Sequence, residues 1–121
     1  MCGISGYIGK KEGLQIVLGN LRKLEYRGYD SAGIAVLNDH SIEVIKKPGK
    51  LTVLKKELAA NPLTGHVSLG HSRWATHGIP NEANAHPHWD CRKEIALVHN
   101  GIIENYQDLK ERLIKEGHEF R

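Results

Sequence analysis

The second residue of the chain is a cysteine, and its place beside the initiator methionine suggests nucleophilic chemistry. Methionine aminopeptidases remove an initiator methionine when the next residue is small, so Cys2 is expected to become the N-terminal residue. Its free α-amine, which is partly neutral near neutral pH, could then take the proton from the thiol. The alternative is a small hydrophobic residue at the start of a strand, and the cysteine alone leaves both interpretations open.

A nucleophile that attacks an acyl carbon needs hydrogen-bond donors for the oxyanion, and "HNG" at residues 99–101 contains two. Asn100 can donate through its side-chain amide, and Gly101 allows its backbone N–H to approach a ligand closely. If this segment is a strand, His99 and Asn100 point to opposite faces, so only one of them can face the site. The alternative is an Asn-Gly turn.

The segment "SRWATHG", residues 72–78, places a guanidinium, an indole, a hydroxyl and an imidazole where a predicted strand gives way to a loop. Arg73 could bind a carboxylate through two parallel hydrogen bonds. Its alternative is a surface ion pair, the commoner role of a single arginine.

A metal site is the competing interpretation of "NAHPHWDC", because His86, His88 and Cys91 are all residue types that bind zinc. A second pair of ligands at a zinc-site spacing is absent from the sequence. The histidines are therefore expected to hydrogen-bond to loop backbone, and neither a metal nor another cofactor is predicted.

Local patterns predict the elements that must position these residues. Short apolar runs predict strands at 3–8 and 66–74, and a hairpin is predicted at 33–46 around a polar loop. Apolar residues at helical spacing predict helices at 12–25 and 51–60.

The second half of the chain is predicted to begin with a long loop at 75–91. The continuously apolar middle of 94–101 predicts a strand with both faces covered. Asn105 is expected to cap a helix at 106–116, with Leu109 and Leu113 facing inward and Gly117 ending it. Runs of strands with flanking helices favour an α+β fold.

The composition is that of an ordinary globular domain, with 121 residues of which 40% are hydrophobic and 26% charged. The net charge of +3 is scattered and does not argue for a nucleic-acid partner. No run approaches the roughly 18 apolar residues of a membrane span, and no signal peptide is recognisable. A cytosolic protein is expected, with Cys2 and Cys91 as thiols rather than as a disulfide.

In this order "MCGI", "LEYRGYDSAG", "RWATHG", "NAHPH" and "HNGIIEN" resemble the class II glutamine amidotransferases, over residues 2–121. The second and third motifs resemble the glutaminase domain of glutamine:fructose-6-phosphate aminotransferases in particular. The resemblance implies an N-terminal nucleophile hydrolase fold, an α-β-β-α sandwich of two antiparallel sheets. Other class II enzymes, such as the purine amidophosphoribosyltransferases and asparagine synthetases, remain an alternative.

The resemblance also implies roles for individual residues. Cys2 would attack the carboxamide of glutamine, releasing ammonia and leaving a glutamyl thioester for water to hydrolyse. Asn100 and the Gly101 amide would form the oxyanion hole. Arg73 would hold the α-carboxylate of glutamine.

Further residues would surround this site by the same resemblance. Thr76 and His77 would complete the loop that closes over glutamine, and Trp74 would gate the passage of ammonia to a second active site. Arg27 and Gly28 would lie against the nucleophile, behind the residues that touch substrate.

The chain ends at Arg121, before a Ser-Glu-Thr-Asp-Thr-Glu segment of the family whose aspartate binds the α-amine of glutamine. The resemblance therefore implies that residues 1–121 are the N-terminal part of the glutaminase domain. The rest of that domain and the sugar isomerase domains would follow. The parent enzyme would be a cytoplasmic homodimer that transfers ammonia to fructose 6-phosphate, with no nucleic-acid or membrane partner. The 121 residues alone are expected to be weakly active or an inert folded fragment.

Overall fold

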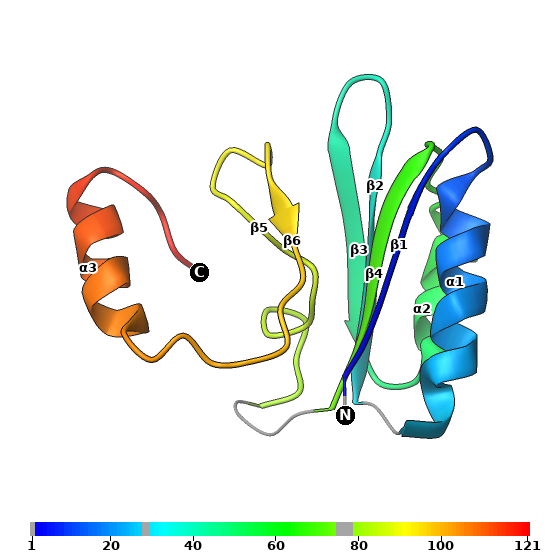
Figure 1. Ribbon diagram of the computed structural model, residues 1–121, viewed down its shortest axis with the longest axis horizontal. Helices are drawn as coiled ribbons and strands as arrows, with labels where there is room; N and C mark the ends of the chain where they lie inside the picture. The colour runs from blue at the N-terminus through cyan, green and yellow to red at the C-terminus, as the bar shows by residue number, and fades with distance from the viewer. Residues whose placement is uncertain (1, 28–29, 75–78) are drawn as a thin grey trace.

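The computed structural model describes residues 2–27, 30–74 and 79–121, the side chain of Arg27 excepted. Its centre is a four-stranded antiparallel sheet (Figure 1). The strands are β1 (Gly3–Ile8), β2 (Ser31–Leu37), β3 (Ile42–Pro48) and β4 (Val67–Arg73). They lie in the order β1-β4-β2-β3, and the predicted strands at 3–8 and 66–74 and the predicted hairpin are confirmed.

The register of the sheet decides which side chains share a face. Gly3 of β1 and Ala32 of β2 both pair with Ser72 of β4. Because side chains alternate along a strand, His71 and Arg73 point to the face opposite to that of Ser72. Two polar residues of β4 are thereby placed together on one face.

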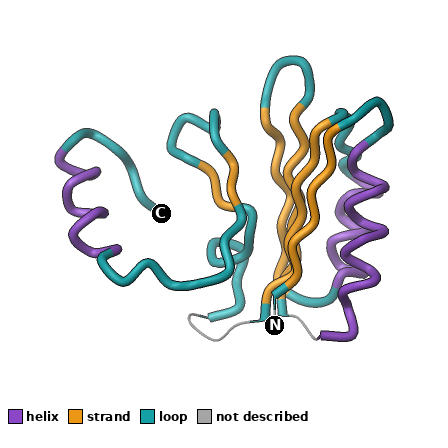
Figure 2. Tube along the Cα trace, in the orientation of Figure 1, coloured by secondary structure: helices purple, strands orange, loops and turns teal. Residues whose placement is uncertain are grey.

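Two helices cover the Ser72 face of the sheet, α1 (Gly13–Leu24) and α2 (Leu51–Ala60), close to the predicted spans (Figure 2). Their leucines recur every three or four residues, which places them on one stripe facing the strands. Burying each large apolar side chain stabilises the fold by about 1.5–3 kcal/mol. The core consists of Leu14, Val17, Leu18, Leu21, Ala32, Ile34, Val36, Leu51, Leu54, Leu58 and Leu63.

The second half of the chain lies on the other side of the sheet (Figure 1). It contains a two-stranded antiparallel hairpin of β5 (His88–Trp89) and β6 (Ala96–Leu97). The prediction of a longer strand covered on both faces is wrong: β6 has two residues, and Ile95 and Leu97 are 61% and 50% exposed. Neither side chain is packed into the core cluster that the described residues form, so the apolar run has too few neighbours to bury it.

The last helix, α3 (Tyr106–Lys115), follows the predicted span but has no buried residue. Leu109 and Leu113 are half-buried rather than enclosed. Asn105 stands at the N-cap position, but its side chain makes no capping hydrogen bond, which corrects that prediction. Its φ of −95° and ψ of 29° depart from the extended backbone that aims a capping side chain at the first turn. Gly117 follows the helix with a φ of +94°, as expected for a helix stop.

A short turn of 3-10 helix, η1 (Glu25–Arg27), links α1 to the segment before β2. Helices and antiparallel strands therefore occupy separate layers, which confirms the predicted α+β class. Within the described ranges, each of the helices is too short or too polar to cross a membrane.

Candidate active site

Cys2 lies immediately before β1, at the end of the sheet where β4 finishes. The Trp74 backbone N–H donates a hydrogen bond to Cys2 Sγ at 3.3 Å, and the Trp74 carbonyl oxygen lies 3.6 Å from the same sulfur. Cys2 is half-buried, whereas Trp74 is 50% exposed. The backbone that follows β4 therefore holds the thiol while leaving it accessible.

Asn100 reaches Cys2 from the distant end of the chain. Its Nδ2 donates to the Cys2 carbonyl oxygen at 3.3 Å, across 98 positions of sequence. Its Oδ1 accepts a hydrogen bond from His71 Nε2 at 2.7 Å. The structure thus brings the candidate nucleophile and the candidate oxyanion donor side by side.

Gly101 follows with a backbone conformation that favours glycine, at a φ of +152°. A Cβ at this position would lie 3.1 Å from Cε1 and 3.2 Å from Nε2 of His99, closer than ordinary van der Waals contact. The backbone N–H of His99 donates to His86 Nδ1 at 3.4 Å. The residues on either side of Asn100 are therefore constrained as well.

Arg73, the last residue of β4, is half-buried on the same sheet face as His71. Its Nη1 donates to the Asn84 carbonyl oxygen at 3.2 Å, and its own carbonyl oxygen accepts from the Asp30 backbone N–H at 2.7 Å. A guanidinium carries five N–H donors in a planar fork whose geometry matches that of a carboxylate. Arg73 is thus fixed between the sheet and the loop that follows it.

Lys46 anchors that loop to the sheet. Its Nζ donates to the Ala85 carbonyl oxygen at 2.7 Å, and only 7% of the residue is exposed. Burial lowers the pKa of the Lys46 ammonium. The negative charge of Glu82 raises this pKa, but by less than burial lowers it. A Cβ at Gly33 would overlap the His86 carbonyl oxygen, so the loop can lie against β2 only because this residue has no side chain.

Three imidazoles are packed together where this loop meets the sheet. The rings of His71 and His86 stack with centroids 4.3 Å apart, and His88 meets His86 edge-on at 4.4 Å. Burial is the main reason why the pKa of all three is lowered, and for His86 it falls to about 3. The Lys46 and Arg73 cations add to this lowering for His86. The stack is therefore neutral near neutral pH, and His86 accepts the expected hydrogen bond from loop backbone.

The zinc alternative is not favoured by the position of Cys91. Its Sγ lies 3.6 Å from His118 Nδ1. This contact of Cys91 is therefore with a histidine other than the two that were considered as zinc ligands. Across residues 2–27, 30–74 and 79–121, no group of three or more His, Cys, Asp or Glu residues is arranged to hold a metal ion. Both cysteines are free thiols.

Several predicted site residues lie outside the described part of the chain. These are Thr76, His77 and Gly28. Arg27 is described only as the last residue of η1, without its side chain. The structure therefore places Cys2, Arg73, Trp74, Asn100 and Gly101 of the predicted set.

Sequence reasoning missed His71 and Lys46. A signal for His71 was present, because strand alternation puts it on the same face as Arg73, two residues later. Lys46 carried no comparable signal, since a lysine at the end of a predicted hairpin is ordinarily a solvent-facing residue. Its burial depends on a loop that is 39 positions away in sequence.

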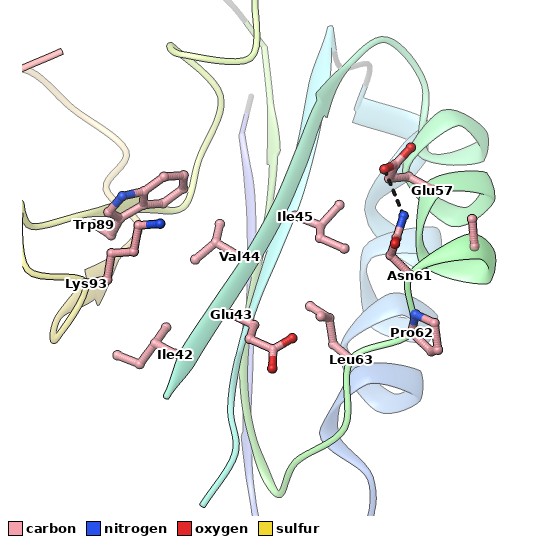
Figure 3. Close-up of a pocket in the computed structure, with 11 residues that line it drawn as sticks. Ile42, Glu43, Val44, Ile45, Glu57, Asn61, Pro62, Leu63, Trp89 and Lys93 are labelled. Atoms are coloured by element: carbon pink, nitrogen blue, oxygen red, sulfur yellow. Dashed lines mark hydrogen bonds between the residues drawn. The ribbon is translucent and has the colours of Figure 1, made fainter. Parts of the chain in front are cut away.

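A cavity of about 760 Å³ lies elsewhere, at the edge strand β3 (Figure 3). Ile42 and Val44 point toward Trp89 and Lys93, while Ile45 points to the opposite side of the strand (Figure 3). None of the candidate catalytic residues lines it. The cavity thus marks an incompletely covered sheet edge and is separate from the chemistry around Cys2.

Comparison with known proteins places this geometry in a family. A family model described as a glutamine amidotransferase domain matches residues 56–121. Glutamine--fructose-6-phosphate aminotransferases (isomerizing) of Pyrococcus horikoshii and Aquifex aeolicus are 54% and 56% identical over all 121 residues. The chain spans about a fifth of the length of these curated relatives, 20% in both cases.

Two solved structures share the fold over the whole chain. The glutamine phosphoribosylpyrophosphate amidotransferase of B. subtilis, in complex with ADP and GMP, superposes with a TM-score of 0.79 at 27% identity. A structure described as the allosteric regulatory enzyme of purine biosynthesis gives 0.81 at 29% identity, and the chain covers 26% of each. The expected N-terminal nucleophile hydrolase fold is confirmed, and the chain belongs to the glutamine amidotransferase family.

Proposed function

We propose that Cys2 is the nucleophile of a glutaminase site that hydrolyses glutamine to glutamate and ammonia. The observation that carries this function is the contact between Asn100 Nδ2 and the Cys2 backbone, at 3.3 Å. It places an amide donor beside the residue that carries the thiol, across 98 positions of sequence, and an acyl-transfer site needs a nucleophile and an oxyanion donor close together. The family membership of the chain supports the same chemistry.

The reaction begins when Cys2 Sγ attacks the side-chain carbonyl carbon of glutamine, after removal of Met1 has freed the α-amine of Cys2. The α-amine takes the thiol proton, a C–S bond forms, and the carbonyl oxygen becomes an oxyanion. The C–N bond then breaks as the amide nitrogen takes the proton back from the α-ammonium group, and ammonia leaves. Water adds to the thioester, the C–S bond breaks, and glutamate and the thiol are released.

The surrounding residues divide the work of binding and stabilisation. Asn100 Nδ2 and the Gly101 N–H donate to the oxyanion, and removing one such donor costs about 100- to 1000-fold in rate. Arg73 binds the α-carboxylate of glutamine in the fork geometry of a guanidinium. Thr76 and His77 are proposed to contribute to glutamine binding on the basis of the family resemblance alone.

The ammonia acceptor that we propose is fructose 6-phosphate, giving glucosamine 6-phosphate. Relatives that are 50–56% identical carry this substrate in their names, whereas the phosphoribosylpyrophosphate enzyme is 27% identical. The chain would then be the N-terminal part of a longer dimeric enzyme, with Trp74 gating the ammonia passage to a sugar isomerase domain. A cytoplasmic location suits its two free cysteines.

The test uses the full-length protein that begins with this chain. Intact-protein mass spectrometry should show Cys2 as the first residue. A diazoketone analogue of glutamine should modify Cys2 and thereby abolish glutaminase activity. Cys2→Ala should have no glutaminase activity and should not be modified by the analogue. Transfer of the glutamine amide nitrogen into glucosamine 6-phosphate when fructose 6-phosphate is supplied, with no amination of phosphoribosylpyrophosphate supplied in its place, identifies the acceptor.

Cys91 supplies the matched control for this labelling. It is exposed, whereas Cys2 is half-buried, so a general alkylating agent should react at Cys91 at least as readily. A glutamine analogue that recognises the proposed site should invert this order and spare Cys91. Equal labelling of both cysteines, or full activity in Cys2→Ala, would contradict the glutaminase assignment.

A further inference from the structure

We infer that His71 is a positioning residue that fixes which end of the Asn100 amide faces the nucleophile. The inference rests on the proposed function for its catalytic consequence. Its structural basis is the hydrogen bond from His71 Nε2 to Asn100 Oδ1, at 2.7 Å.

An asparagine amide has a donor end and an acceptor end of nearly the same shape. In the observed orientation, Nδ2 of Asn100 faces the Cys2 carbonyl oxygen at 3.3 Å, and Oδ1 faces His71. Rotating the amide by half a turn would set Oδ1 against the Cys2 carbonyl oxygen, two acceptors without a proton between them. It would also set the amide NH2 against the N–H of His71. Both neighbours therefore select one orientation.

His71 can make this selection only with a proton on Nε2. Asn100 Oδ1 is an acceptor, so Nε2 must be the donor. The other ring nitrogen, Nδ1, is buried and has no hydrogen-bond partner within the described residues. A neutral ring with its single proton on Nε2 satisfies the one available acceptor and leaves only a lone pair unpaired. Burial lowers the pKa of His71 and so favours this neutral form.

The ring itself has little freedom to turn. His71 lies within β4 and is 1% exposed. Its face stacks on His86 at 4.3 Å with the planes 23° apart, and Lys46 holds the loop that carries His86. The sheet on one side and the stacked imidazole on the other keep Nε2 aimed at Asn100.

The consequence concerns the transition state rather than substrate binding. Negative charge develops on the glutamine carbonyl oxygen only during attack, so a wrongly turned Asn100 would present an acceptor to an oxyanion. Loss of the His71 donor should therefore lower kcat by about ten- to a hundredfold and change KM by less than about twofold.

Two amide variants of the full-length protein separate positioning from simple burial. His71→Gln can place its Nε2 near the position of the histidine Nε2, whereas His71→Asn is one methylene too short to reach Asn100. Both are neutral and polar. We expect His71→Asn to lose kcat and His71→Gln to retain most of it, with thermal unfolding measured on both variants.

A double-mutant cycle tests whether His71 acts through Asn100. In an Asn100→Ala background, His71→Asn should cause no further loss of kcat. The positioning role would be overturned if His71→Asn lowered kcat as much in the Asn100→Ala background as in the wild type. It would also be overturned if His71→Asn and His71→Gln had equal kcat, or if His71→Asn kept full kcat.

A spectroscopic measurement tests the His71–Asn100 hydrogen bond without relying on enzyme activity. Solid-state NMR of protein isotope-labelled on its histidine nitrogens should show a neutral His71 protonated on Nε2, identified by the signal lost in His71→Gln. Protonation on Nδ1 would overturn the inference even in an active enzyme. If Cys2→Ala retains glutaminase activity, the proposed function fails, and this signal still decides whether His71 orients Asn100.

Discussion

The layer formed by residues 3–73 and the segment 88–121 differ in how they use similar local patterns. In the first, α1 and α2 bury their apolar stripes against four strands. In the second, α3 is as amphipathic in sequence but has no buried residue, and the β5–β6 hairpin has two residues in each strand. Helix formation therefore follows from local pattern here, whereas burial depends on a partner surface.

The candidate active site lies at the boundary between these two regions. His71 and Arg73 come from the well-packed sheet, Cys2 immediately precedes its strand β1, and Asn100 comes from the less buried segment. Across this boundary, Asn100 donates a hydrogen bond to the Cys2 carbonyl oxygen and accepts one from His71. The proposed activity would therefore depend on hydrogen bonds that join the sheet layer to the less buried segment.

The largest expected difference between the two regions is in the free energy of unfolding lost when a leucine is truncated. Leu54 in α2 is fully buried, so Leu54→Ala should lower the free energy of unfolding by about 2–5 kcal/mol. Leu113→Ala in α3 should cost less than about 1 kcal/mol, because the leucine is half-buried and alanine favours helix. Urea unfolding followed by circular dichroism compares the two. Equal losses would mean that α3 is packed as tightly as α2.

A smaller effect is expected at Gly33, where the loop rests on the sheet. Gly33→Ala should cost about 1–3 kcal/mol, because its Cβ would overlap the His86 backbone oxygen and the loop would have to move. The site would move with it, so glutaminase activity should fall as well.

Gly19 is the matched control for this substitution. It lies on the exposed side of α1, and a Cβ added there would meet no atom of the described residues within 4 Å. Gly19→Ala should therefore stabilise the chain by about 0.5–1 kcal/mol through helix propensity. If both alanine variants behave alike in thermal unfolding, the close approach of the loop to β2 is wrong.

The mildest perturbation is a change of pH, which acts on the imidazole stack. Burial lowers the pKa of His71, His86 and His88, and the Arg73 cation lowers it further. The Lys46 cation adds to the lowering for His86 and His88. Below about pH 6.5 the unfolded chain binds protons that the folded stack does not bind, so stability falls as the pH falls. The loss continues down to about pH 3, where His86 titrates in the folded state.

Urea unfolding at a series of pH values measures this slope. His86→Gln cannot titrate and should give a shallower slope between neutral and acidic pH. An unchanged slope would show that His86 is not shielded in the folded chain. His40, a histidine in the polar loop of the β2–β3 hairpin, supplies the matched control through His40→Gln, since the loop is exposed.

Much of the first layer could be predicted from the sequence because its patterns are local. Apolar spacing places α1 and α2 to within a residue or two, and the polar loop after Leu37 places the hairpin. Chemistry and the resemblance to a family select Cys2 and Asn100 as partners. The error at residues 94–101 has a physical cause: an apolar run favours a covered strand, but only its neighbours in space determine whether it is covered.

By itself, then, the sequence determined the helices and strands of the first layer, the family, and the residue types able to do glutaminase chemistry. Tertiary structure alone decided which nitrogen of His71 meets Asn100, why Lys46 is buried, and where a loop passes over Gly33. The reason is that periodicity and capping act over a few residues, whereas these contacts join segments that are far apart in the sequence. Pairing β4 with β1 brings positions 2 and 71 to one end of the sheet, and the segment after β6 adds Asn100 through its hydrogen bonds to Cys2 and His71, and no local pattern contains these contacts.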